Sequence, residues 1–226
     1  MIRRALVIGA SGDVGGGIVR ALVADGWHVT AAARSLDRLR ESAIGTDAAV
    51  ATIRADLGSA DGVAALLEAV DPSLMDAVVV SINQRTPPIA LADLESEELE
   101  HRIRANLLPH VRAVRALVPR MREGTTYVAI GGGLADVTMR GLAADSIVQS
   151  SERVLIRAAA KEFGRDGVRV RLATIATPVE GHGARTIAAV PAMPADEVGA
   201  LVVAIAIGDA DDTPFVSVVP RAHGAR

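Results

Sequence analysis

The chain has 226 residues, enough for one α/β domain with a single sizeable core, and half of them are hydrophobic. The formal net charge of -3 leaves no basic surplus for nucleic acid or anionic lipid. Cysteine is absent, which excludes disulfides and thiolate chemistry. Neither a signal-peptide pattern nor a long apolar run is present, so we expect a soluble, cytoplasmic protein without nucleic-acid or membrane partners.

Short apolar runs alternate with segments of helical periodicity along the chain. The runs cover residues 4–10, 27–33, 48–55, 76–82, 125–131, 168–175 and 214–219. Segments between them, such as DGVAALLEAV, place apolar residues at i, i+3, i+4 and i+7. This alternation predicts one doubly wound, Rossmann-type α/β domain over residues 1–226, with a parallel sheet covered on both faces. The Gly- and Pro-containing segment 177–194 is expected to form a lid over a cleft.

A glycine-rich turn, GASGDVG, follows the first run and leads directly into a helical segment. Glycines at 9, 12 and 15 allow a tight turn and a close approach of backbone to a pyrophosphate at the helix N-terminus. This placement predicts a dinucleotide site that includes Gly9, Ser11, Gly12, Asp13, Val14 and Gly15. A carboxylate near a phosphate is repulsive, so we expect the Asp13 side chain to face solvent.

The second strand ends in Ala33-Arg34, followed by Ser35. An acidic residue that would bind the adenosine ribose hydroxyls is missing there, and Arg34 supplies a planar cation suited to a 2'-phosphate. This pattern favours NADP(H) as cofactor. The alternative is a solvated arginine at a strand end, because arginine is common throughout this chain.

With these motifs, residues 1 to about 180 resemble a short-chain dehydrogenase/reductase. The glycine turn is similar to that family's GxxGxxG fingerprint, and Arg34 stands where its NADPH-preferring members have arginine. Asn106 fits the helix asparagine that orders a water and a helix bend in the family. The resemblance implies further cofactor contacts from Asp56, Leu57, Ser81, Ile82, Asn83 and Thr177.

The catalytic positions depart from that family's pattern. Counting back from KEFGRDGVRV, the tyrosine position falls on Asp145, the lysine position on Gln149 and the serine position on Gly132. The only tyrosine is Tyr127, in a predicted strand, and the only lysine is Lys161. The family's ketone reduction needs a tyrosine whose pKa is lowered by the lysine, so that mechanism is excluded.

Asp145 is the first alternative proton donor, because a carboxyl group in an apolar pocket can act as an acid. The competing interpretation is structural: Ser146 and Gln149 fit a capping box at the start of a helix. His182 in the predicted lid is a second candidate, and His110 lies one helical turn beyond Asn106. Backbone N–H groups of residues 131–133 could bind a substrate oxygen. The spacing of the histidines predicts no metal site.

We therefore expect an NADP(H)-dependent oxidoreductase with a non-standard proton donor, with Asp145, Asn106 and His182 as catalytic candidates. Its substrate would be a small molecule such as an imine, an enone or a natural-product intermediate. Two alternatives stay open: an inactive NADP(H)-binding sensor or partner subunit, and a lyase, isomerase or cyclase that uses the same cleft. The family resemblance also implies a homodimer or homotetramer.

Overall fold

The computed structural model describes residues 2–41, 47–181, 192–208 and 215–218. Its centre is a sheet of seven strands in the order β3-β2-β1-β4-β5-β6-β7 within these residues, and every pairing is parallel. The strands are β1 Arg4–Ile8, β2 His28–Ala33, β3 Val50–Arg54, β4 Ala77–Val80, β5 Thr126–Gly132, β6 Arg169–Ile175 and β7 Phe215–Val218. Each falls within a predicted run or within one residue of it, and β7 forms the sheet edge as expected.

Seven α-helices connect or follow these strands within the described residues. They are α1 Asp13–Ala24, α2 Leu36–Glu41, α3 Ala60–Ala69, α4 Ser96–Arg102, α5 Leu108–Leu117, α6 Ala143–Phe163 and α7 Ala195–Ile207. A π-helical turn, Ile103–Leu107, joins α4 to α5. Short 3-10 turns occur at Pro72–Leu74, Leu91–Asp93, Val118–Arg120, Gly133–Ala135 and Gly164–Asp166.

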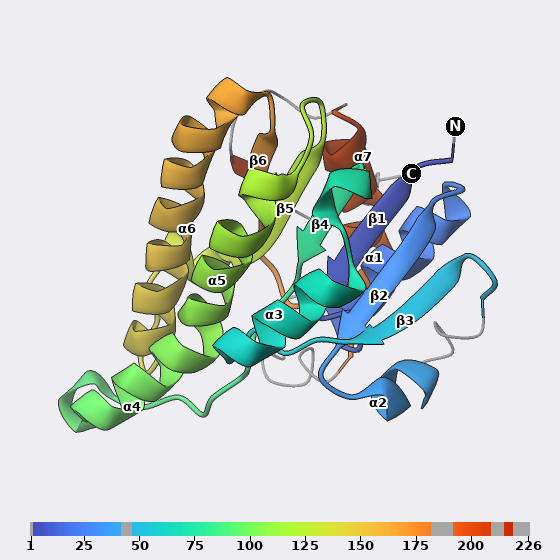
Figure 1. The fold of residues 1–226 in the computed structure, drawn as a ribbon. Coiled ribbons are helices and arrows are strands. Elements are labelled where there is room, and N and C mark those ends of the chain that lie inside the picture. The colour runs from blue at the N-terminus through green and yellow to red at the C-terminus, as the bar shows by residue number, and fades with distance from the viewer. Residues whose placement is uncertain (1, 42–46, 182–191, 209–214, 219–226) are drawn as a thin grey trace, which may run out of the picture.

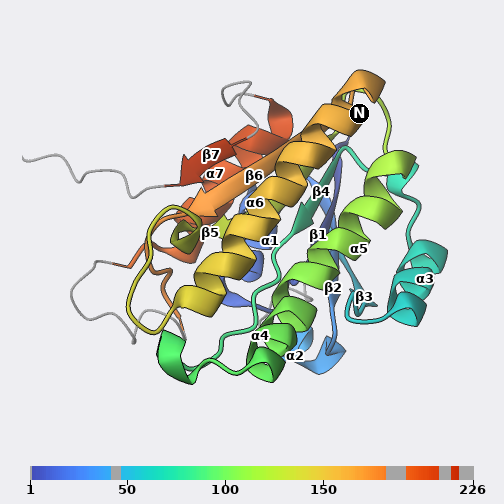
Figure 2. The same ribbon diagram turned by 90° about the vertical axis from the view of Figure 1, so that its left-hand side faces the viewer.

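The helices cover both faces of the sheet (Figures 1 and 2). Helices α3, α5 and α6 lie on one face, and α1 and α7 lie on the other. Neighbouring residues of a strand point to opposite faces, so β1 contributes Leu6 to the core under α3, α5 and α6 and Val7 to the core under α1 and α7. The predicted doubly wound α/β fold is confirmed, and its nearly continuous apolar strands are explained by burial on both faces.

The start of α6 differs from the capping-box prediction. The helix begins at Ala143 with Leu142 as its N-cap residue, and no side chain caps it. The Ser146 amide donates to the Leu142 carbonyl, so Ser146 already lies inside the first turn. Its hydroxyl is buried without a hydrogen-bond partner among the described residues. The capping box is wrong because the helix begins three residues before the serine that was expected to cap it.

The buried hydroxyl of Tyr127 makes the folding of the sheet core sensitive to high pH. The Tyr127 ring is fully buried in β5, and its hydroxyl has no hydrogen-bond partner among the described residues. Burial raises the pKa of this hydroxyl far above its usual value, and the negative charge of Glu152 raises it further. The unfolded chain ionises its tyrosine above pH about 10 and the folded chain does not, so the free energy of unfolding should fall as pH rises past that value.

We therefore predict that the tyrosinate absorbance band appears only together with alkaline unfolding, followed by circular dichroism. Tyr127→Phe should fold with unchanged or slightly higher stability, by up to about 1 kcal/mol, because an unpaired buried hydroxyl is removed. A tyrosinate band that develops while the protein stays folded would show that the hydroxyl is accessible.

Candidate active site

Two adjoining pockets lie at the carboxyl ends of the strands, on either side of the point between β1 and β4 where the strand order reverses. In open α/β sheets this is where ligands bind. We name them the arginine pocket, which contains Arg34, and the glutamate pocket, which contains Glu152. Ser81, Ile82 and Asn83 line both, so the two pockets form two halves of one cleft.

The glycine turn makes the floor of the arginine pocket, a cavity of about 240 Å³ that Gly9, Ser11 and Gly12 help to line. Gly9 has a φ of +85°, and a β-carbon there would lie 1.9 Å from the Ser81 carbonyl oxygen. A β-carbon on Gly15 would lie 2.2 Å from the Gly9 carbonyl oxygen. Only glycine fits these two positions, which lets strand β1 turn tightly into α1 and exposes backbone N–H groups at the helix start.

Asp13 does not face open solvent as expected. Its side chain is partly buried and lies against Gly181, where a β-carbon would come within 2.3 Å of the Asp13 carboxyl carbon. The first residue of α1 thus contacts the segment after β6. The carboxylate also lies at the N-terminus of α1, where a negative charge is stabilised by the helix dipole.

Three guanidinium groups surround the other side of the arginine pocket. Arg34 follows β2, Arg38 lies in α2, and Arg104 lies in the π-helical turn. Both Arg34 and Arg38 are exposed, and the pocket also contains Asp56. Arg38 was missed in the sequence, although its place one helical turn after Arg34 was a usable signal. The pocket can hold a ligand with more than one negative charge.

The remaining predicted contacts of this half are also located. Asp56 accepts a hydrogen bond from the Gly58 amide at 2.8 Å, which shapes the turn after β3. Leu57 is buried and contributes to the pocket wall. Ser35 accepts a hydrogen bond from the Arg38 amide at 3.4 Å and so stabilises the start of α2.

The glutamate pocket has a volume of about 210 Å³ and lies beyond the ends of β4, β5 and β6. Of the predicted residues, Val14, Asn83, Asn106 and Thr177 line it, together with Ser81 and Ile82. His182 and the lid residues 182–191 lie outside the described residues. The described ends of the expected lid include Pro178 and Val179, which line the pocket.

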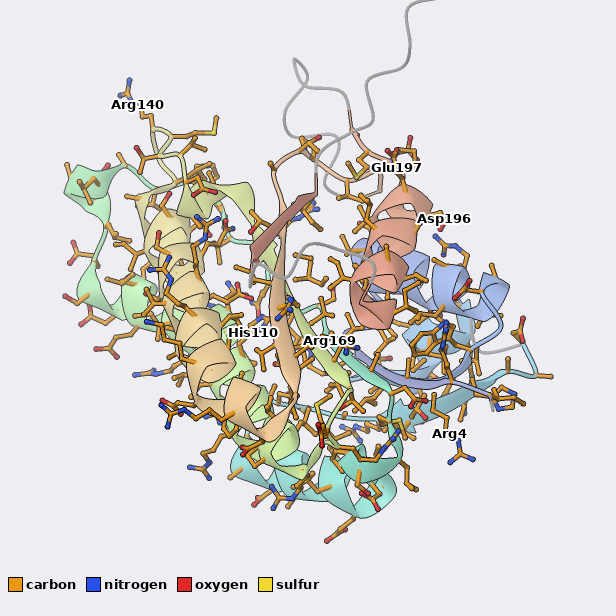
Figure 3. All side chains as sticks on the ribbon, turned by 90° about the horizontal axis from the view of Figure 1, so that it is seen from above. Arg4, His110, Arg140, Arg169, Asp196 and Glu197 are labelled. Carbon is orange, nitrogen blue, oxygen red and sulfur yellow. The ribbon has the colours of Figure 1, made fainter. Side chains whose placement is uncertain are left out.

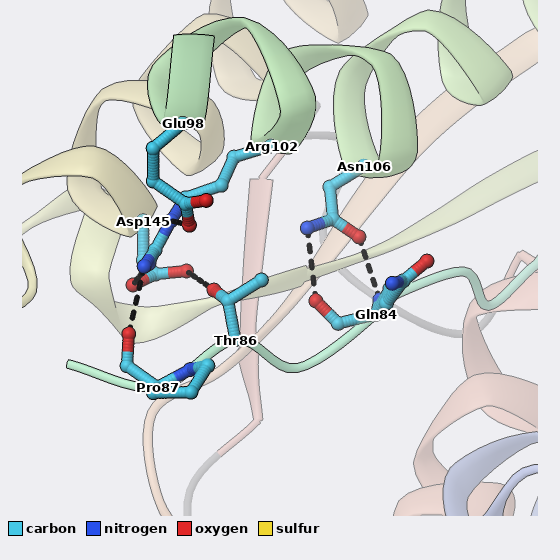
Figure 4. Close-up of polar contacts among 7 residues, drawn as sticks. All are labelled: Gln84, Thr86, Pro87, Glu98, Arg102, Asn106 and Asp145. Atoms are coloured by element: carbon cyan, nitrogen blue, oxygen red, sulfur yellow. Dashed lines mark hydrogen bonds and ion pairs between the residues drawn. The ribbon is translucent and has the colours of Figure 1, made fainter. Parts of the chain in front are cut away.

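Asn106 lies in the π-helical turn and binds the loop after β4 (Figure 4). Its Oδ1 accepts a hydrogen bond from the Gln84 amide at 2.6 Å, and its Nδ2 donates to the Gln84 carbonyl at 3.0 Å. Both polar atoms of this buried amide are therefore used by one backbone segment. Asn106 therefore fixes the loop after β4, which forms part of the cleft wall. The π-helical turn orients the Asn106 side chain toward that loop.

Asp145 is part of a buried ionic network centred on Arg102 (Figure 4). The Arg102 side chain is 1% exposed and donates to Asp145 Oδ2 at 2.7 Å, to Glu98 Oε1 at 2.8 Å and to the Pro87 carbonyl at 2.7 Å. The Asp145 carboxylate is thus held by a charge-assisted hydrogen bond to a buried side chain. Asp145 is also not among the residues that line the glutamate pocket. This arrangement does not support its expected role as the acid.

Gln149 fills the space beside Gly132. Its Oε1 accepts a hydrogen bond from the Leu134 amide at 2.9 Å, and a β-carbon on Gly132 would lie 2.4 Å from that oxygen. The glycine is therefore required by the glutamine, which connects α6 to the loop after β5. Of the three family positions named in the sequence, Asp145 and Gln149 make structural contacts and Gly132 makes room for one of them.

Glu152 was missed in the sequence. It lies on α6 one turn after Gln149, its side chain is 6% exposed, and it lines the glutamate pocket. The signal was a charged residue at a helix position that shares a face with the buried Val148 and Ile156. Tyr127 and Lys161 are not among the lining residues of either pocket, and Lys161 is exposed near the end of α6.

Comparisons with known proteins agree with this geometry. The family model described as short chain dehydrogenase matches residues 3–180, and the chain belongs to that family. Among solved structures, a short-chain dehydrogenase from Streptomyces avermitilis is similar with a TM-score of 0.84 and 20% identity, covering 97% of this chain and 89% of that one. The short-chain dehydrogenase/reductase from Serratia marcescens BCRC 10948 has a TM-score of 0.81 and 20% identity over 96% of both chains.

A third similar structure is a short chain dehydrogenase from Burkholderia cenocepacia J2315 in complex with NADP, with a TM-score of 0.80 and 22% identity over 96% of both chains. No curated protein matches this chain in sequence. Within the described residues no helix is long and apolar enough to span a membrane. In the same ranges, no three His, Asp or Glu side chains gather as metal ligands would.

The Arg102 network gives a stability prediction. Asp145→Asn removes one of the two carboxylate charges that compensate a buried guanidinium, so we expect the free energy of unfolding to fall by about 2 to 3 kcal/mol. The control is Glu100→Gln, which breaks the exposed pair between Glu100 and Arg104 and should cost less than about 0.5 kcal/mol. Urea unfolding of both variants measures the difference. Equal losses of unfolding free energy in the two variants would mean that the Arg102 guanidinium does not need Asp145 as a partner.

The contact between Gly132 and Gln149 gives a second prediction. Gly132→Ala should lower the free energy of unfolding by about 1 to 3 kcal/mol, because the added methyl group overlaps the hydrogen-bonded glutamine amide. In a Gln149→Ala background the same change should cost much less. A double-mutant cycle measured by urea unfolding tests the coupling. If the two substitutions have additive effects on the free energy of unfolding, the destabilisation by Gly132→Ala does not come from its contact with Gln149.

Proposed function

We propose that this protein is an NADP(H)-dependent oxidoreductase of the short-chain dehydrogenase type whose proton source is not a tyrosine–lysine pair. The observation that carries the proposal is the arginine pocket, in which Arg34 and Arg38 stand beside a glycine turn that has no room for a β-carbon at Gly9 or Gly15. Its substrate would be a small molecule with a C=N bond or a conjugated C=C bond. Bound NADPH would supply a hydride to that bond.

The residues present fit the phosphorylated cofactor. Gly9 and Gly15 let the backbone turn tightly into the N-terminus of α1, where a pyrophosphate is stabilised, because a β-carbon at either position would clash with neighbouring backbone. Ala33 leaves no acidic side chain at the end of β2, while Arg34 can pair with a 2'-phosphate. The Burkholderia relative in complex with NADP supports the same choice of cofactor.

The wall of the second half would orient the substrate and exclude water. Asn106 holds the loop after β4 through Gln84, and Thr177 and Pro178 border the glutamate pocket on the side of β6. The ionic pairing of Asp145 with Arg102 favours one alternative, a protein that binds NADP(H) without hydride transfer. Transfer of hydride from NADPH to any small molecule would count against that alternative.

We also propose that the chain assembles as a homodimer or homotetramer through α5 and α6. The outer face of these helices exposes Val111, Ile147 and Val154, and Ile147 and Val154 lie two turns apart on α6. An apolar stripe of this kind on a helix is typical of a surface that packs against another chain.

The cofactor assignment is tested by titrating the purified protein with NADPH and NADH. Arg34→Ala should weaken NADPH binding about 10- to 100-fold and leave NADH binding nearly unchanged, because only the phosphorylated cofactor loses a charge-assisted hydrogen bond. Arg40→Ala is the matched control, since Arg40 lies in α2 and pairs with Asp37 at the surface. Equal losses for both cofactors, or tighter NADH than NADPH binding by the wild type, would contradict the assignment.

A further inference from the structure

A buried carboxyl group opens onto the glutamate pocket. Glu152 projects from α6, and its Oε1 atom is buried without a hydrogen-bond partner among the described residues. Charged side chains are seldom buried in this way unless they are paired or functional. Glu152 is not part of the Arg102 network, whose member on α6, Asp145, lies two turns earlier in that helix. The Arg102 network therefore does not explain why Glu152 is buried.

The partner of Glu152 is His110, which is fully buried on α5. The Nδ1 atom of His110 lies 3.3 Å from Glu152 Oε1, although the two are not oriented as a hydrogen bond. On the other side of the ring, His110 Nε2 lies 3.1 Å from the Ile82 carbonyl oxygen. Figure 3 shows His110 near the middle of the molecule, between α6 and the sheet, while Arg140 lies at its edge.

The Ile82 carbonyl decides which nitrogen of His110 carries the proton. A carbonyl oxygen only accepts, so Nε2 must donate to it. In a neutral imidazole Nδ1 is then the acceptor, and it faces Glu152. A single further proton can reside on the carboxyl oxygen or on Nδ1. The geometry thus places a carboxyl oxygen and an imidazole nitrogen 3.3 Å apart, close enough to compete for one proton.

The surroundings of the pair favour the uncharged carboxyl group. Burial raises the pKa of Glu152, and His110 partly offsets this effect. From β5, Tyr127 faces the pair with an uncharged hydroxyl. From the loop after β4, Arg85 lines the same pocket and is exposed. The pair therefore lies between a desolvated interior and the cleft, where a proton donor is useful.

We propose that Glu152 is the proton donor of this site and that His110 is its positioning residue. This inference rests on the proposed function, because it assigns the proton that accompanies the hydride. It replaces Asp145 as the carboxyl group that faces the cleft. When bound, NADPH would supply a hydride and its two electrons to the electrophilic carbon of a C=N bond, or to the β-carbon of an enone, and would leave as NADP⁺.

The π electrons of the substrate then move to the imine nitrogen, or through the enolate to its α-carbon, and that atom takes the proton from the Glu152 hydroxyl. The O–H bond breaks and leaves a carboxylate next to His110. A proton from water restores the acid through the pocket. The products are an amine or a saturated ketone, the carboxyl group regains its starting state, and no other redox partner is needed.

The shared proton is tested without substrate by nuclear magnetic resonance of protein with isotope-labelled histidine. His110→Asn identifies the His110 signal, and the exposed His28 and His101 serve as internal references. We expect His110 in the Nε2–H form, with a titration that changes in Glu152→Gln while the references do not move. A His110 signal that titrates like His28 and is the same in Glu152→Gln would overturn the shared proton.

Adding NADP⁺ to the same sample tests whether the pair faces the cofactor. We expect the His110 signal to shift at saturation while His28 and His101 do not. Binding without any shift of His110 would place the pair away from the reaction and overturn the proposal. A wild-type protein that binds neither NADP⁺ nor NADPH would instead overturn the proposed function, and the cofactor-free titration would still decide whether the two residues share a proton.

Proton donation is measured as NADPH oxidation with cyclohexenone and methylpyrroline as probes. Glu152→Gln should lower kcat for the probe that the wild type reduces by about 100-fold and remove the decline of kcat at high pH, because the acid acts only while protonated. Glu152→Asp should recover part of the rate, and His110→Asn should shift the pH profile. Glu162→Gln, an exposed change on the same helix, is the control. Full activity of a folded Glu152→Gln protein would overturn the assignment and leave the cofactor assignment intact.

Discussion

The parallel direction of the strands is the constraint on which the site depends. Parallel pairing brings the carboxyl ends of the described strands to one edge, and the reversal of strand order between β1 and β4 leaves a cleft there. Residues as distant in sequence as Gly9, Asn83 and Thr177 then border neighbouring cavities. Neither α5 nor α6 contains a site by itself. Each contributes a side chain to a cleft whose place is determined by the sheet.

The two halves of the cleft use charge differently. On the side of β2 the guanidinium groups are exposed, so they can exchange water for a charged ligand at low cost. On the side of α6 the charged groups are buried and must find partners inside the protein. Arg102 finds three acceptors, whereas among the described residues Glu152 has only His110 within ion-pair distance. The Arg102 side chain, with its three acceptors, stabilises the wall of the cleft. The Glu152 carboxyl group has no hydrogen-bond partner among the described residues, so it stays available for a reaction.

Sequence periodicity predicted the strands, the doubly wound sheet and the glycine turn, because these depend on local spacing and on burial of both sheet faces. Many of the residues that line the arginine pocket were named from similarly local signals, namely the glycine turn and the ends of the first strands. The other half of the cleft did not follow from such signals, since it depends on contacts between distant segments: Asp145 was interpreted without knowledge of Arg102, which is 43 residues away. Glu152 was missed for the same reason, because its burial against α5 is a property of packing. The capping box failed because Leu142 starts the helix earlier than the polar residues suggest.

The Arg102 network also restricts the routes by which this chain could change. A tyrosine at position 145 would remove a carboxylate partner from a cation that is out of contact with water. A lysine at position 149 would remove the glutamine oxygen that accepts a hydrogen bond from the Leu134 amide in the loop after β5. Positions 102 and 145 are therefore coupled, and a change at one is tolerated only when the other changes with it. The buried guanidinium makes the composition of the cleft wall depend on α4, a helix whose Arg102 lines neither pocket.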